Sequence, residues 1–223
     1  MATGLDKNLD SLVLKLPEFR DMEFTPERHI FLLWALTSAV THSGGERPIL
    51  VGGGAIEFYT STRFSTGDLD LIAPDMKITK EVLKELGFER PTGARHYVNR
   101  AMGALVEIHS SRLRQHEEAI ELVYRKVPLL LISPEDCIVH RLASYKKHES
   151  TVDLLNSFML AYHQADRLDM ERLTSRLHEK KLWDYYIPIQ DICRELVINQ
   201  IGVDEAAASL IHFMNHGAKE CAF

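Results

Sequence analysis

The stretch Pro48-Ile-Leu-Val-Gly-Gly-Gly-Ala-Ile-Glu57, followed by Phe64-Ser-Thr-Gly-Asp-Leu-Asp-Leu-Ile72, decides our interpretation of the fold. A short apolar run at 49–51 stops at three consecutive glycines, which is typical of a buried strand that ends in a tight turn. Apolar residues then recur at helical spacing over 55–60. We therefore predict a strand, a glycine turn and a helix in this order.

The second strand of the stretch carries two aspartates in alternation with leucines. Asp68 and Asp70 are therefore expected on one face, with backbones roughly 6.5–7 Å apart, so that both side chains can converge on one cation. The glycine turn offers N–H groups that a phosphate can approach at the start of a helix. A phosphate-binding turn together with a pair of carboxylates is typical of sites for metal-assisted phosphoryl or nucleotidyl transfer. The alternative is a solvated acidic strand edge.

The spacing of the glycines argues against a dinucleotide-binding fold. That fingerprint needs a glycine at its sixth position, where this chain has Glu57 if Gly52 is counted first. The Gly-Lys-Ser/Thr of a Walker loop does not follow either. A plain turn explains one or two glycines, whereas three after a buried strand favour close approach by a ligand.

The stretch resembles the signature of the nucleotidyltransferase superfamily, which includes DNA polymerase beta, the minimal nucleotidyltransferases and the AbiE-type toxins. In that signature an apolar residue precedes two small residues, and a spacer leads to an Asp-apolar-Asp motif and later to an acidic residue between apolar ones. The matching positions are Val51, Gly53-Gly54, the spacer 55–67, Asp68-Leu69-Asp70-Leu71 and Val106-Glu107-Ile108. The resemblance is most specific over 48–110.

The resemblance implies a complete set of site residues. Asp68, Asp70 and Glu107 would be the catalytic acids and would hold the metal, Mg²⁺ or Mn²⁺. Glu107 can also take the proton from an attacking hydroxyl. Gly53 and Gly54 would hold the terminal phosphates of a nucleoside triphosphate through their backbone N–H groups.

The third acid has alternatives in the sequence. Glu107 can instead be a strand residue that faces solvent, and Asp75 and Glu57 are then weaker candidates for its role. His109 lies two residues after Glu107, on the same expected strand face. We expect it at the edge of the pocket.

Several basic and polar residues are candidate nucleotide contacts. Arg63 and Thr66 precede the aspartates, as a similar Arg-x-x-Thr does in related toxin-like sequences. The segment 133–144 resembles a helix that carries a basic residue, usually lysine, toward the site in AbiE-type proteins, and Arg141 is its nearest match. An ordinary surface arginine is the alternative for Arg63 and Arg141. Candidates beside a neighbouring strand are Arg95, His96 and Arg100.

Composition restricts the classes of partner and compartment. The 223 residues carry a net charge of −6, so long-range steering toward nucleic acid by the whole molecule is not expected. Three cysteines without metal-ligand spacing indicate reduced thiols, and the first ten residues lack a signal-peptide pattern. We expect a cytoplasmic protein without a membrane span.

The order of predicted elements indicates an α+β fold. Strands mixed with helices occupy the first part of the chain, and helical periodicity alone continues from about residue 150. We expect a nucleotidyltransferase-like domain at 1–148, with N-terminal helices at 1–45 and a small mixed sheet flanked by helices. Residues 149–223 would form a helical C-terminal domain.

The resemblance implies transfer of a nucleoside monophosphate from a triphosphate, such as ATP, to a hydroxyl. The acceptor would be RNA (for example a tRNA end), a protein side chain or a small molecule. In the toxin-like branch an antitoxin would be the partner. The alternative is a module of the same fold that binds a nucleotide or a partner without turnover.

Overall fold

The computed structural model describes residues 22, 26–61, 67–199 and 201–216. Residues 1–21, which include part of the expected N-terminal helices, and the candidates Arg63 and Thr66 lie outside these ranges. Contacts divide the chain into two compact units, Met1–Ser133 and Pro134–Phe223. The expected domain boundary after residue 148 stays a prediction, and the helix 134–148 belongs by its contacts to the second unit.

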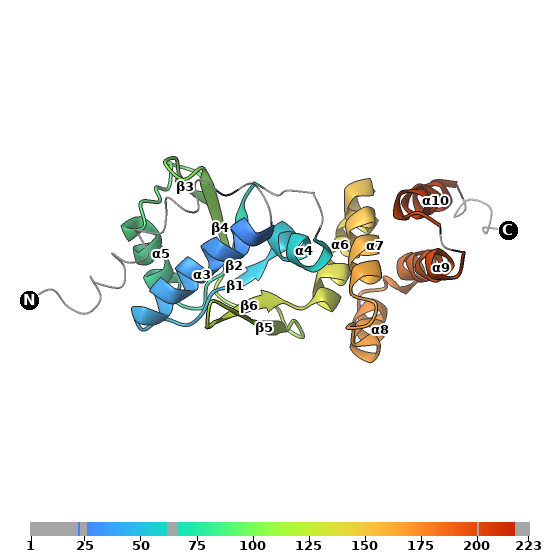
Figure 1. The fold of residues 1–223 in the computed structure, drawn as a ribbon, viewed down its shortest axis with the longest axis horizontal. Coiled ribbons are helices and arrows are strands. Elements are labelled where there is room, and N and C mark those ends of the chain that lie inside the picture. Colours follow the sequence, from blue (N-terminus) through green and yellow to red (C-terminus); the bar gives the residue numbers. More distant parts are fainter. Residues whose placement is uncertain (1–21, 23–25, 62–66, 200, 217–223) are drawn as a thin grey trace, which may run out of the picture. The chain divides into compact units, whose positions relative to one another are not determined.

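The first unit is built around a sheet that helices cover (Figure 1). Its elements are α3 (Pro26–His42), β1 (Ile49–Val51), α4 (Gly52–Thr60), β2 (Leu69–Ile72), α5 (Met76–Glu85), β3 (His96–Asn99), β4 (Ala104–Ser110), β5 (Ala119–Tyr124) and β6 (Val127–Ile132). The strand order is β3-β4-β2-β1-β6-β5. β1 runs antiparallel to β2 and parallel to β6, and β2 runs parallel to β4, so the sheet is mixed as predicted.

Helix α3 supplies the largest part of the helical cover. It begins with a proline, which lacks the N–H that a first helical turn would leave unpaired, and Glu27 follows at the positive end of the helix dipole. Its apolar residues are almost fully buried, among them Phe31, Leu33 and Leu36. α3 packs against α4, α5 and β6 and thereby fixes α4 over the sheet.

Helix α4 begins earlier than the sequence predicted. We expected a glycine turn before a helix at 55–60, but the helix starts at Gly52 and contains all three glycines. A glycine inside a helix destabilises it by roughly 1 kcal/mol relative to alanine. Three consecutive glycines therefore predict a turn rather than a helix. The glycines thus form the first turn of α4, directly after the buried strand β1.

Strand β5 was not predicted. It pairs with β6 in an antiparallel hairpin whose two-residue turn is Arg125-Lys126, and both turn residues have a left-handed φ, 47° and 66°. Arg125 lies over the rings of Phe31 and Trp34, with its Cζ at 4.8 and 5.3 Å from the ring centroids. The turn is therefore tied to α3 by its first residue.

The second unit is helical throughout its described part, which confirms the expected all-α C-terminal part. Its elements are α6 (Pro134–His148), α7 (Thr151–His163), α8 (Met170–Glu179), α9 (Trp183–Asn199) and α10 (Val203–His216). Asp136, fully buried in α6, pairs with Arg172 at 2.6 Å and with Arg176 at 3.2 Å, both from α8. A buried carboxylate needs such partners, and this one fixes α8 against α6.

Candidate active site

Two acids lie side by side on β2 and β4, which are neighbouring parallel strands. Asp70 of β2 and Glu107 of β4 are register partners, so their side chains leave the sheet at the same level. Each side chain is only 17% exposed. The sequence predicted that these two residues would meet, and the structure brings them together.

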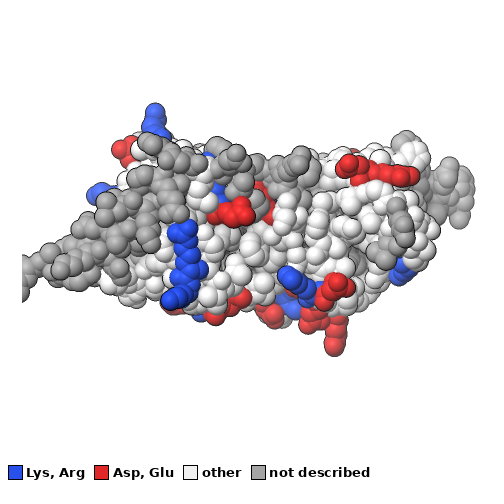
Figure 2. Space-filling view, in the orientation of Figure 1, with Lys and Arg blue, Asp and Glu red and all other residues white. Residues whose placement is uncertain are grey.

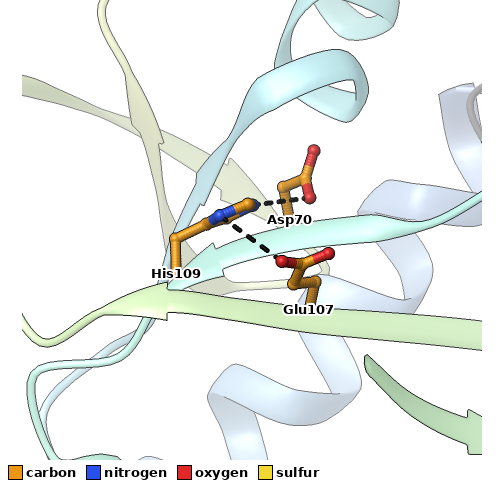
Figure 3. Close-up of side chains that lie close together, drawn as sticks. All are labelled: Asp70, Glu107 and His109. Carbon is orange, nitrogen blue, oxygen red and sulfur yellow. Dashed lines mark hydrogen bonds and ion pairs between the residues drawn. The ribbon is translucent and has the colours of Figure 1, made fainter. Parts of the chain in front are cut away.

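A third residue of β4 completes a cluster with the two acids (Figure 3). His109 Nε2 lies 2.8 Å from Asp70 Oδ1, and its Nδ1 lies 3.8 Å from Glu107 Oε1. The close-up shows the imidazole lying between the two carboxylates. One ligand atom from each of the three residues lies within 4.8 Å of the others. His109, expected at the pocket edge, is thus a member of the cluster.

The first turn of α4 closes the site from the side of β1. Gly52 has a φ of +63°, in the left-handed region that favours glycine. A Cβ at this position would collide with Asp70, 2.9 Å from its Cβ and 2.8 Å from its Cγ. Only glycine lets the Asp70 carboxylate approach the backbone here.

The other two glycines have different surroundings. The backbone N–H of Gly53 donates a hydrogen bond to Asp70, so the helix start and the acid are in direct contact. Gly54 is buried, and a Cβ there would lie 3.2 Å from Leu50 Cδ1 and 3.8 Å from the ring of His29. The absence of a side chain at Gly54 therefore serves the packing of α4 on α3 and β1.

Burial and like charge act on Asp70. Desolvation raises the pKa of Asp70 above its usual range, and although the hydrogen bond from His109 opposes this, the charge of Asp68 adds to it. Asp68 precedes β2 directly and is part-exposed. A divalent cation would relieve the conflict between these carboxylates, because it favours their ionised forms.

A buried histidine–glutamate pair joins α4 to α3. His29 Nδ1 of α3 lies 2.8 Å from Glu57 Oε2 of α4, and both residues are buried. Glu57, a weaker candidate for the third acid, is thus engaged inside the helical layer. Asp75, the other such candidate, accepts a hydrogen bond from the backbone N–H of Glu46 at 2.7 Å. Both acids have structural partners away from the cluster.

The remaining candidates lie apart from the cluster or beside it. His96 of β3 lies 3.8 Å from Glu107 Oε2 and is half exposed, while Arg95 and Arg100 are exposed. Arg141 belongs to the helical unit, where its guanidinium donates to Asp153 Oδ1 at 2.9 Å. Its nucleotide-binding role stays a prediction.

Charge on the molecular surface is dispersed on the face shown in Figure 2. Lysine and arginine side chains of the described residues form separate groups there, with uncharged surface between them. This view agrees with the negative net charge and gives no continuous basic band of the kind that tracks a nucleic-acid backbone.

The donor set of the cluster fits a divalent metal. Two carboxylates offer the hard oxygen ligands that Mg²⁺ and Mn²⁺ prefer, and an imidazole adds a nitrogen ligand that suits the transition ions. Burial raises the pKa of Asp70, and strongly perturbed acids of this kind cluster at functional sites.

The mixed sheet, the helix that opens with glycines and the neighbouring acids on β2 and β4 are the features that the sequence led us to expect of a nucleotidyltransferase. The chain belongs to the family described as "Nucleotidyltransferase of unknown function (DUF6036)", whose model matches residues 33–207. The matched region includes the glycine helix, the acid cluster and most of the helical unit. The superfamily implied by the sequence is thereby confirmed.

No individual related protein was found beside the family. Searches of curated proteins and of solved structures find no match to the chain. Across the helices that the structure describes, none is both long and apolar enough to cross a membrane.

Two residues of the site were not among the predicted site residues. Gly53 and Gly54 were predicted to bind phosphate, which stays a prediction, whereas Gly52 was not singled out although only a glycine leaves room there for Asp70. A signal existed, since Gly52 is the residue that directly follows the strand. His109 could be found from its spacing to Glu107, but the sequence does not indicate the register shift of β4 at this residue.

Proposed function

We propose that this protein is a metal-dependent nucleotidyltransferase that moves a nucleoside monophosphate from a triphosphate to a hydroxyl, with pyrophosphate leaving. One observation carries the proposal: Asp70 and Glu107 lie side by side on β2 and β4, and the glycine turn of α4 contacts Asp70 directly. The family described above supports the same class of reaction.

Asp70 and Glu107 would hold the metal. Asp68, whose charge acts on Asp70, would contribute a third carboxylate, as the resemblance implies. When bound, Mg²⁺ or Mn²⁺ would neutralise charge on the triphosphate and polarise the phosphorus centre that is attacked. Glu107 also serves as the acceptor for the proton that the attacking hydroxyl loses. This role fits a carboxylate at the rim, 17% exposed, rather than one in the core.

The start of α4 would bind the terminal phosphates. The N-cap residue, Val51, has no side chain that hydrogen-bonds the first turn, so backbone N–H groups at Gly52 and Gly53 are the donors at this end. Gly54 lies deeper and shapes the packing. We assign Arg63 and Thr66 to the triphosphate by resemblance only, because they lie outside the described residues.

The test is release of pyrophosphate from each of the four nucleoside triphosphates with Mg²⁺ or Mn²⁺ and a panel of RNA, protein and small hydroxyl acceptors. Asp70→Asn and Glu107→Gln should lower the rate about 100-fold or more. The matched control is Glu121→Gln. Glu121 lies on the edge strand β5 of the same sheet and pairs with Arg47 at 2.7 Å. Full activity in either site variant would disprove the assignment.

A binding module without turnover is the second reading of the same site. It predicts nucleotide binding that depends on metal and on Asp70, without pyrophosphate release for any acceptor. A thermal-shift series with and without metal separates the readings, because a ligand of the folded state raises the midpoint of unfolding.

A toxin paired with an antitoxin is the more specific form of the proposal. Several large apolar residues of the helical unit are exposed, among them Val152 at 61%, Ile198 at 69% and Phe213 at 49%. A protein partner that covered these side chains would remove their apolar area from water. Recovery of a neighbour-encoded protein with the full chain, lost in Phe213→Ser with Ile198→Ser, would support it; equal recovery with the double variant would refute this surface.

A further inference from the structure

We propose that His109 is itself a ligand of the metal, and that the site thereby selects a first-row transition ion such as Mn²⁺ over Mg²⁺. The inference rests on the metal site proposed above and specifies its donor set. Three observations carry it: the irregularity of β4, the position of the imidazole and the contrast with a second histidine nearby.

The irregularity of β4 lies at His109. Leu71 of β2 pairs with Ile108, but the next residue, Ile72, pairs with Ser110, so His109 is an extra residue without a register partner. Pairing then resumes, since the N–H of Ala73 donates to the carbonyl of Ser110 at 2.9 Å. A bulge of this kind re-aims a side chain and is common next to active sites.

The imidazole lies between the two acids. One nitrogen reaches Asp70 on the neighbouring strand at 2.8 Å, and the other faces Glu107 on its own strand at 3.8 Å (Figure 3). A residue that served only the sheet would need neither contact. Its ligand atom lies within 4.8 Å of those of both acids, a spacing at which three ligands can share one ion.

His96 provides the contrast. It lies opposite Glu107 on β3, at the same 3.8 Å from that carboxylate, and its side chain is 49% exposed against 46% for His109. The distinguishing feature is the 2.8 Å hydrogen bond between His109 Nε2 and Asp70 Oδ1. The cluster with matching ligand atoms accordingly comprises Asp70, Glu107 and His109.

The donor set determines which ions the site prefers. Mg²⁺ takes oxygen ligands and retains its waters, so an imidazole adds little to its binding. Transition ions bind imidazole well, and their affinities for mixed nitrogen and oxygen sites rise along the first row from Mn²⁺. A site of two carboxylates and one imidazole therefore binds Mn²⁺ more tightly than Mg²⁺, although Mg²⁺ is the smaller ion.

The experiment measures metal binding to the full-length protein without any substrate. Mn²⁺ is titrated by electron paramagnetic resonance and Mg²⁺ by competition, and pulsed measurements of the bound Mn²⁺ detect coupling to a directly bound nitrogen. We expect nitrogen coupling in the wild type and in His96→Asn. In His109→Asn the coupling is lost, and Mn²⁺ affinity falls about tenfold or more relative to Mg²⁺ affinity.

A second variant, His109→Gln, and a circular-dichroism spectrum of each variant guard against a folding defect. The paramagnetic resonance measurement on the wild type tests the inference without any variant. Bound Mn²⁺ without nitrogen coupling in the wild type overturns the inference, as does coupling that survives in His109→Asn but disappears in His96→Asn. Failure of Mn²⁺ to bind overturns it too.

Failure of this inference differs from failure of the proposed function. Metal-dependent pyrophosphate release without nitrogen coupling would leave the activity standing and remove His109 from the ligand set. Nitrogen coupling without turnover for any acceptor would support the ligand assignment and remove the activity.

Discussion

Gly52 is the residue on which the geometry of the acid cluster depends most directly. Its left-handed φ of +63° strains any other residue, and a Cβ would push against Asp70. We expect Gly52→Ala to lower the free energy of unfolding by at least about 1–2 kcal/mol, which is the left-handed penalty alone. It should also abolish the metal-dependent rise in the unfolding midpoint, because Asp70 must move.

Gly44 offers the matched control for this prediction. It has a φ of +83°, but nothing lies within 4 Å of the position of its Cβ. Gly44→Ala should therefore show a comparable loss of stability by urea unfolding and an unchanged response to metal. A normal metal response in Gly52→Ala would show that Asp70 tolerates the displacement.

The sequence indicated the positions of Asp70 and Glu107. It indicated the place of His109 only in part, and it did not indicate the close approach of Gly52 to Asp70. Asp70 and Glu107 sit in patterns whose period of two assigns each side chain to one face of a strand. Their meeting required only that β2 and β4 be neighbours in register, which they are. Periodicity placed His109 on the face of Glu107, but its 2.8 Å contact with Asp70 lies beside a register shift that no residue type indicates.

The β5–β6 hairpin stores backbone strain in its turn. Arg125 and Lys126 both adopt a left-handed φ, where natural hairpins prefer Asn-Gly. We expect Lys126→Gly to raise the free energy of unfolding by roughly 1 kcal/mol, since glycine removes the strain of this position. Urea unfolding at neutral pH measures the change.

Arg125→Gly is the informative comparison for that hairpin. It relieves the same type of strain but removes the guanidinium that lies over Phe31 and Trp34. Because cation–π contacts contribute about 0.5–2 kcal/mol, the gain should be cancelled or reversed. Equal stabilisation by both variants would mean that these ring contacts contribute nothing.

A carboxylate in α7 predicts how the helical unit responds to acid. Burial would raise the pKa of Asp153, but hydrogen bonds from Ser144 and Arg141 outweigh it and hold the pKa below the ordinary value of 3.8. The stabilisation is therefore complete above the ordinary pKa and is lost as pH falls through the lowered one. We expect the stability advantage of wild type over Asp153→Asn to be constant near neutral pH and to vanish in strong acid.

Unfolding in urea from pH 2 to pH 7 measures this difference, with Trp183 as the reporter of the helical unit. Asp191→Asn is the control, because that acid forms an exposed pair with Arg194 at 3.1 Å. Surface pairs of this kind contribute little. An advantage of wild type that grew toward low pH would contradict the sign of the shift.

At the scale of elements, the sequence predicted the strands of the site and missed β5. β5 has no buried face, and its residues are part-exposed or exposed along its whole length, so alternation does not mark it. Its turn lacks the glycine or asparagine that signals a hairpin. The early start of α4 was missed because local propensity opposes glycine in a helix, whereas the approach of Asp70 requires it.

At the scale of the whole molecule, the two tryptophans of the chain report on different units. Trp34 lies in α3 of the first unit and Trp183 in α9 of the second. Mn²⁺ with a nucleoside triphosphate should raise the unfolding midpoint seen by Trp34 in the Trp183→Phe background, because a ligand stabilises the unit that binds it.

The same reporters test the predicted role of Arg141. If Arg141 binds phosphate, the midpoint seen by Trp183 in the Trp34→Phe background should rise as well, and Arg141→Ala should remove that rise. If Arg141 only pairs with Asp153, the variant lowers the stability of the helical unit and leaves the response of Trp34 to ligand unchanged. His140→Ala, one position away on α6, is the neighbouring control.

The hydrogen bond from Gly53 to Asp70 has a consequence for the sequence of events at the site. That amide is engaged by the protein's own acid before any ligand arrives, so an incoming phosphate must compete for it. A cation that drew the Asp70 carboxylate toward itself would release the amide. The steady-state kinetics should therefore be ordered, with the metal entering first and the triphosphate second.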